Sequence, residues 1–332
     1  MNISIIGSGN AGCAHAFKFK SIILKKGSKI KVLKYLIKKL FLLKLFLLKD
    51  PKIYANKSFR GAFNRDINWD NPINLIEKIF WLQIYSDITL WTRCADKYLV
   101  REYVKERGCE NILNELYGKY DNADEIDWES LPDSFVLKTN HACGQVILIK
   151  NKKDVNKREI CEKLTEWMNL KYGIPIQLHY LRIKPCIIAE MLFINKDNPE
   201  KSLIDYKIWC FHGVPECILV VHNRTQNGYF LTVYDLEWNN ISKLALKEKT
   251  THGDNISKPK SFDKMIEYAK ILSEGIPQVR VDFYDINEEP VLGEMTFSTG
   301  FGYFTDSFYD YLGSKIDLSK IKKLEHPNKL IF

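Results

Sequence analysis

The pattern of apolar and polar positions changes near residue 134. Before it, apolar residues recur at helical spacing, which predicts helices over 71–92 and 96–107, the first with Asn71 as its cap and Pro72 at its first position. After it, short β-branched and aromatic runs are typical of strands. The later elements expected are strands over 135–138, 146–149, 186–193, 206–211, 217–221 and 229–234, and helices over 157–170 and 261–273. This order predicts an α+β fold.

The most informative segment, 278–304, consists of two β-rich runs around a polar turn and predicts a hairpin. Alternation puts Arg280 and Asp282 on one face of the first strand, and Glu294 and Thr296 on one face of the second. A loop with an odd number of residues pairs Asp282 with Glu294, whereas an even loop puts them on opposite faces. Two carboxylates that lie opposite each other repel, and a divalent cation such as Mg²⁺ bound between them makes the arrangement favourable. The alternative is a hairpin whose polar face is merely solvated.

The N-terminal part contains two patterns of its own. Residues 1–21 hold a G-x-G-x-x-G motif at 7–12, but the acidic residue expected about 20 positions later is missing, so we do not expect a working Rossmann domain. Residues 22–50 predict a basic amphipathic helix that ends at Asp50 and Pro51. Lysines interrupt it too often for a bilayer span, which leaves a helix in the lipid headgroup layer or a buried helix with snorkelling lysines.

The composition narrows the class of protein. Of the 332 residues, 45% are hydrophobic and 13% aromatic, which is typical of a folded chain. The eight cysteines form no C-x-x-C pair, which favours free thiols in a reducing compartment. The net charge of +8 is concentrated early, so a local basic element is expected, and no nucleic-acid partner. We therefore expect a cytoplasmic protein that is peripheral on the inner face of the membrane if the helix binds lipid.

Three charged residues within β-rich runs are candidates for a nucleotide site. Lys138 ends a strand just before a polar turn that contains Gly144, where a lysine can reach a phosphate and turn N–H groups can cradle its oxygens. Glu190 ends an apolar strand and needs a donor, either a nucleotide or an internal ion pair. Lys207 is a second lysine within a strand. Together with the carboxylate hairpin, the two lysines begin to describe a phosphate and magnesium site.

Several segments are more specific in combination than any one of them. They are ADKYLVREYV (95–104), LPDSFVLKTNH (131–141), DYK (205–207), FHG (211–213), RVDFY (280–284) and GEMTF (293–297). The chain thereby resembles the ATP-grasp enzymes, and among them the TupA-like group named for teichuronopeptide biosynthesis. The resemblance covers roughly residues 50–315. It implies an ATP-grasp fold with two α+β lobes over 134–315 that clamp a nucleotide, preceded by a helical region at 51–133 and followed by a tail at 316–332.

The resemblance also implies roles for individual residues, with ATP and Mg²⁺ as cofactors. Lys97, Lys138 and Lys207 would contact the phosphates, and the turn that holds Asn140 and Gly144 would be a mobile loop over them. Glu190 and Leu192 would form the adenine hinge. Asp282, Glu294 and Thr296 would bind the metal, and Arg280 would be the catalytic cation. Thr296 departs from the family, which usually has asparagine there. A hydroxyl is a weaker magnesium ligand than an amide oxygen, so one metal is expected to bind loosely.

The implied reaction is ATP-dependent ligation of a carboxylate to an amine through an acylphosphate. The TupA-like group suggests that an amino acid or peptide is joined to a carboxyl sugar of a cell-surface polysaccharide. One alternative is a glycosyltransferase of the same pathway, although no clean Asp-x-Asp pair is present for its metal. The other alternative is a non-catalytic binding module at the membrane surface. The presence of the lysines and carboxylates together argues against it. The oligomeric state is not fixed by the sequence.

Overall fold

The fold is described from a computed structural model of the chain. The described residues are 50–172, 177–195, 202–225 and 228–329. The G-x-G-x-x-G motif and the basic segment at 28–49 lie outside them. Within the described residues, no helix is both long and apolar enough to cross a membrane.

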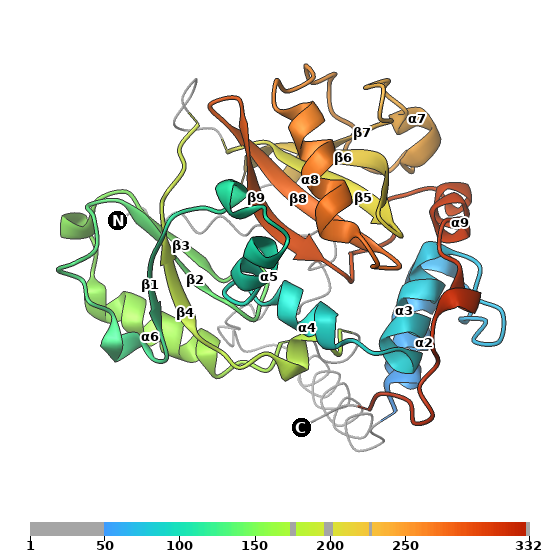
Figure 1. The fold of residues 1–332 in the computed structure, drawn as a ribbon, viewed down its shortest axis with the longest axis horizontal. Helices are drawn as coiled ribbons and strands as arrows, with labels where there is room; N and C mark the ends of the chain where they lie inside the picture. The colour runs from blue at the N-terminus through green and yellow to red at the C-terminus, as the bar shows by residue number, and fades with distance from the viewer. Residues whose placement is uncertain (1–49, 173–176, 196–201, 226–227, 330–332) are drawn as a thin grey trace, which may run out of the picture.

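The larger lobe is built on an antiparallel five-stranded sheet in the order β7-β6-β5-β8-β9. Its strands are β5 (Asp205–Phe211), β6 (Val214–Thr225), β7 (Gly228–Tyr234), β8 (Val279–Ile286) and β9 (Glu289–Thr296). The central strand β5 is buried along its whole length, and α8 (Phe262–Ser273) packs against it (Figure 1). Burial on both sides explains why β5 reads as a bulky apolar run in which only Asp205 and Lys207 are charged.

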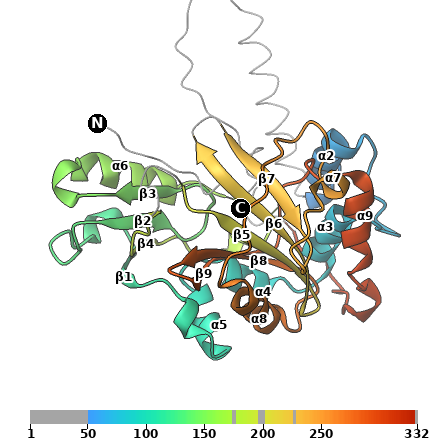
Figure 2. The same cartoon turned by 90° about the horizontal axis from the view of Figure 1, so that it is seen from above.

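The smaller lobe contains a four-stranded antiparallel sheet in the order β1-β4-β2-β3. Its strands are β1 (Leu116–Tyr120), β2 (Phe135–Thr139), β3 (Val146–Ile149) and β4 (Ile187–Glu190). The helix α6 (Lys157–Met168) covers one face and buries Ile160 and Leu164 in a core that is separate from that of the larger lobe. Figure 2 shows the two sheets as distinct lobes, with α6 on the outside of the smaller one.

The remaining helices pack around the larger lobe or between the lobes. They are α2 (Pro51–Phe63), α3 (Leu75–Tyr85), α4 (Thr89–Ala95), α5 (Val100–Glu106), α7 (Ser242–Ala245) and α9 (Asp306–Ser314), with short 3₁₀ turns η2 (Glu110–Ile112), η3 (Ala123–Glu125), η4 (Lys152–Asp154), η5 (Tyr180–Arg182) and η6 (Leu318–Lys320). The helices α3 and α9 contact each other although they are far apart in the sequence (Figure 1).

One expected helix boundary is wrong, and it has a capping reason. The helix that was expected to end at Asp50 and Pro51 lies outside the described residues; Asp50 itself caps the start of α2, with its side chain accepting from the Lys52 N–H at 2.9 Å and Pro51 in the first turn. The helix α3 is capped by Asn74, not Asn71. Asn74 and Glu77 form a capping box, in which each side chain accepts from the other residue's backbone N–H.

The sequence analysis missed β1 and α9. β1 reads LYGKY, which has no clean alternation, so pairing with β4 and not local pattern makes it a strand. Segment 51–133 therefore holds this strand as well as helices. The tail is polar but docked, since the Asn328 amide donates to the carbonyls of Gln83 at 2.9 Å and Ser86 at 2.8 Å.

The cysteines of the described residues differ from the expectation at one position. Cys94, Cys109, Cys161, Cys186, Cys210 and Cys217 carry free thiols. Cys143, in the turn after β2, is disulfide-bonded, so the expectation of free thiols is wrong there.

Candidate functional site

The β8–β9 hairpin brings the two candidate metal-binding carboxylates together. Its turn is tighter than expected, with two residues, Asn287 and Glu288, at φ 56° and 66° between the paired Ile286 and Glu289. An even turn alone would separate the carboxylates, but the register shifts at a β-bulge that inserts Gly293. Beyond the bulge, Asp282 pairs with Glu294 and Arg280 with Thr296. The bulge supplies the one additional residue that the pairing of Asp282 with Glu294 requires.

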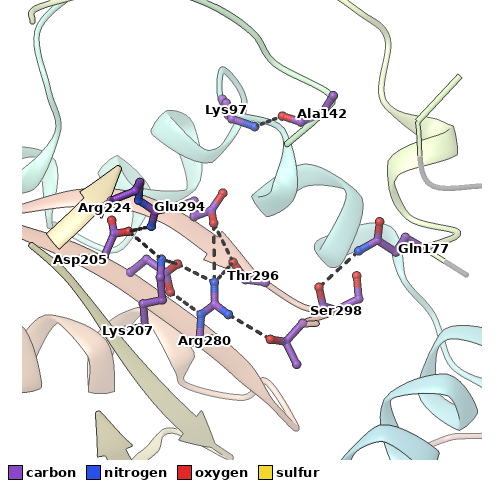
Figure 3. A network of polar contacts seen from close by, with 12 residues as sticks. Lys97, Ala142, Gln177, Asp205, Lys207, Arg224, Arg280, Glu294, Thr296 and Ser298 are labelled. Atoms are coloured by element: carbon purple, nitrogen blue, oxygen red, sulfur yellow. Dashed lines mark hydrogen bonds and ion pairs between the residues drawn. The ribbon is translucent and has the colours of Figure 1, made fainter. Parts of the chain in front are cut away.

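Arg280 lies at the centre of a buried polar network (Figure 3). Its Nε and one Nη each donate to Asp282 at 2.6 Å, in a bidentate ion pair. The guanidinium also donates to the hydroxyls of Thr296 at 3.1 Å and Thr299 at 3.0 Å, and lies 3.7 Å from Glu294. Burial alone would lower the pKa of Arg280, but the charge of Asp282 outweighs it and raises that pKa. Arg280 therefore stays charged inside the lobe.

A second set of charges extends this network along β5 and β6. The Lys207 ammonium donates to Asp282 at 2.6 Å and lies 3.6 Å from Asp205. Arg224, from β6, donates to Asp205 at 2.5 Å (Figure 3). Burial tends to raise the pKa of Asp282, but Arg280 and Lys207 overcome this effect and hold it below its usual value. The larger lobe thus presents two cations, Lys207 and Arg224, and one carboxylate, Asp205, beside the hairpin.

The smaller lobe contributes a second charged cluster around Glu190. Glu190 pairs with Val136 in the sheet, and its carboxylate accepts from Lys138 at 2.7 Å and from Arg101 at 3.4 Å. Of the two donors considered for Glu190, the structure shows the internal ion pair. The Lys138 side chain is still 25% exposed, so it can also face a ligand.

Lys97 and Asn140 organise the turn between β2 and β3. Lys97, which lies between α4 and α5, donates to the Ala142 carbonyl at 2.6 Å and so ties this turn to the helical segment (Figure 3). Burial lowers the pKa of Lys97, although the charge of Glu294 opposes that shift. The Asn140 side chain is fully used within the protein, since it donates to Asp96 at 2.9 Å and accepts from the Cys186 N–H at 2.7 Å. These hydrogen bonds fix the turn.

One cavity of about 280 Å³ lies between the lobes and collects most of the predicted site. Its wall contains seven of the expected residues, namely Lys97, Lys138, Glu190, Leu192, Lys207, Asp282 and Glu294. Four others are not in the wall, namely Asn140, Gly144, Thr296 and Arg280. Gly144 lies in the turn at φ 74°. Thr296 and Arg280 lie behind the wall, each 1% exposed.

The sequence analysis missed four charged residues of the wall, Arg101, Lys150, Asp205 and Arg224. Arg101 and Asp205 lie inside the motifs quoted above, at i+4 from Lys97 and two residues before Lys207, which is a signal that could have found them. Arg224 lies outside those motifs, near the end of β6, and only the pairing of β6 with β5 brings it to Asp205.

The wall of the cavity is apolar in part and includes Ala95, Val136, Leu148, Leu192 and Phe193. A flat heteroaromatic ring fits such a lining, whereas the lysines and Arg224 of the same wall suit a polyanion. The composition of the wall therefore matches a nucleotide.

The donor set fits a magnesium ion by chemical type. Asp282 and Glu294 form a cross-strand pair in the cavity wall and offer the oxygen ligands that Mg²⁺ prefers. Glu294 is the more accessible of the two, with its side chain 20% exposed, against 3% for Asp282. Among the described residues there is no group of three or more His, Cys, Asp or Glu side chains around one such position. A bound ion would thus depend on oxygens of the ligand as well.

Residues 77–317 match the profile of the family described as TupA-like ATPgrasp. No curated protein matches the sequence. Among solved structures, the chain is similar to D-alanine–D-alanine ligase from Bacillus anthracis, with 16% identity and a TM-score of 0.44, covering 70% of this chain and 69% of that one.

Two further solved structures are similar over shorter shares of their own length. The Bacillus anthracis D-alanine–D-alanine ligase complexed with ATP has 12% identity and a TM-score of 0.38, and the match covers 64% of this chain and 57% of that one. The L-amino acid ligase from Bacillus licheniformis has 14% identity and a TM-score of 0.36, with 61% of this chain and 40% of that one covered.

Proposed function

The chain belongs to the TupA-like ATP-grasp family, and we propose that it is an ATP-dependent ligase that joins a carboxylate to an amine. The family match confirms the resemblance found in the sequence motifs and the expected ATP-grasp fold. The observation that carries the proposed activity is the convergence of Lys97, Lys138, Lys207 and the Asp282–Glu294 pair on one cavity. These side chains come from both lobes, as a nucleotide clamped between them requires.

The reaction proceeds in two steps. An oxygen of the substrate carboxylate attacks the γ-phosphorus, the bond from that phosphorus to the β,γ-bridging oxygen breaks, and ADP leaves. The amine nitrogen then attacks the acyl carbon, the carbon–oxygen bond to phosphate breaks, and the nitrogen gives up a proton as the amide forms. Inorganic phosphate is the second product. No protein nucleophile is needed.

Residues of the chain would neutralise the negative charge that builds up in these steps. Two anions must approach each other, so Lys138, Lys207 and Arg224 would neutralise phosphate oxygens from the cavity wall. Arg280 is fixed by two hydrogen bonds to Asp282, so it would act mainly by holding that carboxylate in place. Asp282 and Glu294 would hold a magnesium ion, which when bound supplies further neutralisation of the phosphates. The turn over 140–145 would exclude water from the acylphosphate.

We propose that the substrates are a carboxyl sugar of a cell-surface polysaccharide and an amino acid or peptide. Membership of the TupA-like group supports this choice. The basic amphipathic pattern of residues 22–50 supports a location at an anionic membrane surface, close to a lipid-linked acceptor. Deletion of residues 22–49 should abolish binding to anionic liposomes, and unchanged binding would refute the membrane location.

The activity is tested by ADP release over a panel of uronic acids and amino acids with magnesium. Glu294→Gln should abolish turnover, whereas Glu289→Gln, on the same strand but exposed and paired with Lys264, should not. A thermal melt separates the activity from a glycosyltransferase, because ATP with magnesium should raise Tm and a UDP-sugar should not. Protection by UDP-sugars alone would contradict the ligase.

A further inference from the structure

Arg101 lies in the wall of the nucleotide cavity, but the mechanism proposed above does not use it. It belongs to α5, whose Val100 and Val104 are buried in the core of the larger lobe. Its guanidinium nevertheless reaches the smaller lobe, where it lies 3.4 Å from the carboxylate of Glu190 at the end of β4. Arg101 therefore connects the core of one lobe to the sheet of the other.

A hydrogen bond to the backbone fixes the guanidinium of Arg101 in this position. One Nη donates to the Asn114 carbonyl, just before β1, at 2.6 Å. The Asn114 amide donates to the Met191 carbonyl at 3.0 Å, and the Met191 N–H donates to the Glu115 carbonyl at 3.0 Å. Arg101 is thus held beside the segment that follows β4, and its other Nη donates to Glu190.

The two carboxylate oxygens of Glu190 are divided between two cations. Oε1 accepts from Arg101 at 3.4 Å, and Oε2 accepts from Lys138 at 2.7 Å. Glu190 is buried, so its charge needs these partners. The Lys138 side chain is 25% exposed, against 14% for Arg101, and no backbone carbonyl is its partner among the described residues. Lys138 is therefore the cation that can turn toward a ligand in the cavity.

A phosphate that draws Lys138 into the cavity changes the charge balance at Glu190. The buried carboxylate then has one cation fewer. Arg101 remains beside it, because the Asn114 carbonyl holds the guanidinium independently of Lys138. Without Arg101, the same movement would leave Glu190 with no ion-pair partner among the described residues, and the binding of the phosphate would have to overcome that penalty.

We propose that Arg101 is a positioning residue that makes Lys138 available to ATP, because it compensates the charge of Glu190 when Lys138 turns to the phosphates. Arg101 acts through Glu190 and Lys138 and makes no contact with the nucleotide. The proposal rests on the nucleotide site proposed above, and it adds how that site releases one of its phosphate-binding lysines.

The test is titration of the full chain with ATP and magnesium by isothermal calorimetry. Arg101→Gln should weaken ATP binding about 10-fold or more, since Lys138 must then leave a buried charge uncompensated. Arg101→Lys keeps a positive charge beside Glu190 and should restore most of the affinity. Arg93→Gln is the matched control and should leave the affinity unchanged, because Arg93 is paired with Glu106 at 2.6 Å and lies outside the cavity wall.

The same substitution in a Glu190→Gln background separates this role from a direct contact. Without the carboxylate there is no buried charge to compensate, so Arg101→Gln should change the ATP affinity of that variant by less than about 2-fold. An equal loss in both backgrounds would assign Arg101 to the nucleotide itself or to the support of Asn114, and would overturn the proposal. A loss in Arg101→Lys as large as that in Arg101→Gln would overturn it as well.

The outcomes also separate this proposal from that of the nucleotide site. If the parent chain binds no ATP, the nucleotide site fails, and the role of Arg101 fails with it. If the parent chain binds ATP and Arg101→Gln binds it equally well, the nucleotide site stands and only the role of Arg101 is overturned.

Discussion

Arg280 and Asp282, two residues apart on β8, form a bidentate ion pair whose side chains are only 1% and 3% exposed. A buried pair of this kind contributes little by its presence but costs much when one partner is removed, because the other is left uncompensated. Asp282→Asn should lower the free energy of unfolding by about 3–5 kcal/mol, since both Arg280 and Lys207 lose their counter-charge. Urea unfolding measures the loss.

Lys207→Met is the comparison for that prediction. It leaves Asp282 paired with Arg280, and Asp205 with Arg224, so its cost should be clearly smaller. Equal losses for the two variants would mean that Lys207, not Arg280, is the partner on which Asp282 depends.

The bulge residue Gly293 has little room for a side chain. A Cβ there would lie 3.2 Å from the Asp282 carbonyl and 3.2 Å from the Tyr284 ring. Gly293→Ala should therefore destabilise the protein by about 1 kcal/mol or more, because the hairpin must open around the extra methyl group. Gly61→Ala, in α2 with no atom within 4 Å of its Cβ, should stabilise it by roughly 0.5–1 kcal/mol. Chemical denaturation of both variants checks the prediction, which fails if they shift stability in the same direction.

The hairpin shows how far the sequence determines the site. Alternation correctly placed Asp282 on the same face of its strand as Arg280, and Glu294 on the same face of its strand as Thr296. The pairing of Asp282 with Glu294, however, depends on a two-residue turn and a bulge at Gly293 that compensate each other. Neither the turn length nor the bulge can be found from period-2 alternation, because each alters the register by its own amount.

Long-range pairing accounts for what the sequence did not reveal. The strands β2, β3, β5 and β7 were predicted to within two residues because their apolar runs are local signals. β1 has no such signal and forms only because β4 lies beside it. Glu190 was correctly identified as needing a donor, but the choice of Arg101 and Lys138 depends on how α5 and β2 meet β4.

Arg224 is expected to take part in ATP binding, although no motif marks it. It lines the nucleotide cavity, and its side chain is only 9% exposed. Arg224→Gln should weaken ATP binding roughly 10- to 100-fold, the effect of losing a hydrogen bond to a charged group. Arg224→Lys should keep part of the affinity. Fluorescence titration with a labelled ATP analogue measures both, and unchanged affinity in the Gln variant would assign Arg224 only to holding Asp205.

His179 should make the protein less stable in mild acid. It is fully buried against Trp91 and Tyr180, neither ring nitrogen has a hydrogen-bond partner among the described residues, and burial lowers its pKa to about 3. Because the unfolded chain binds a proton near pH 6.5 and the folded chain does not, stability falls as the pH drops below that value. His179→Phe removes this effect, so its advantage in unfolding free energy over the parent should grow by about 2 kcal/mol between pH 7 and pH 5. Parallel stability curves for the two proteins would show that His179 is protonated in the folded state as well.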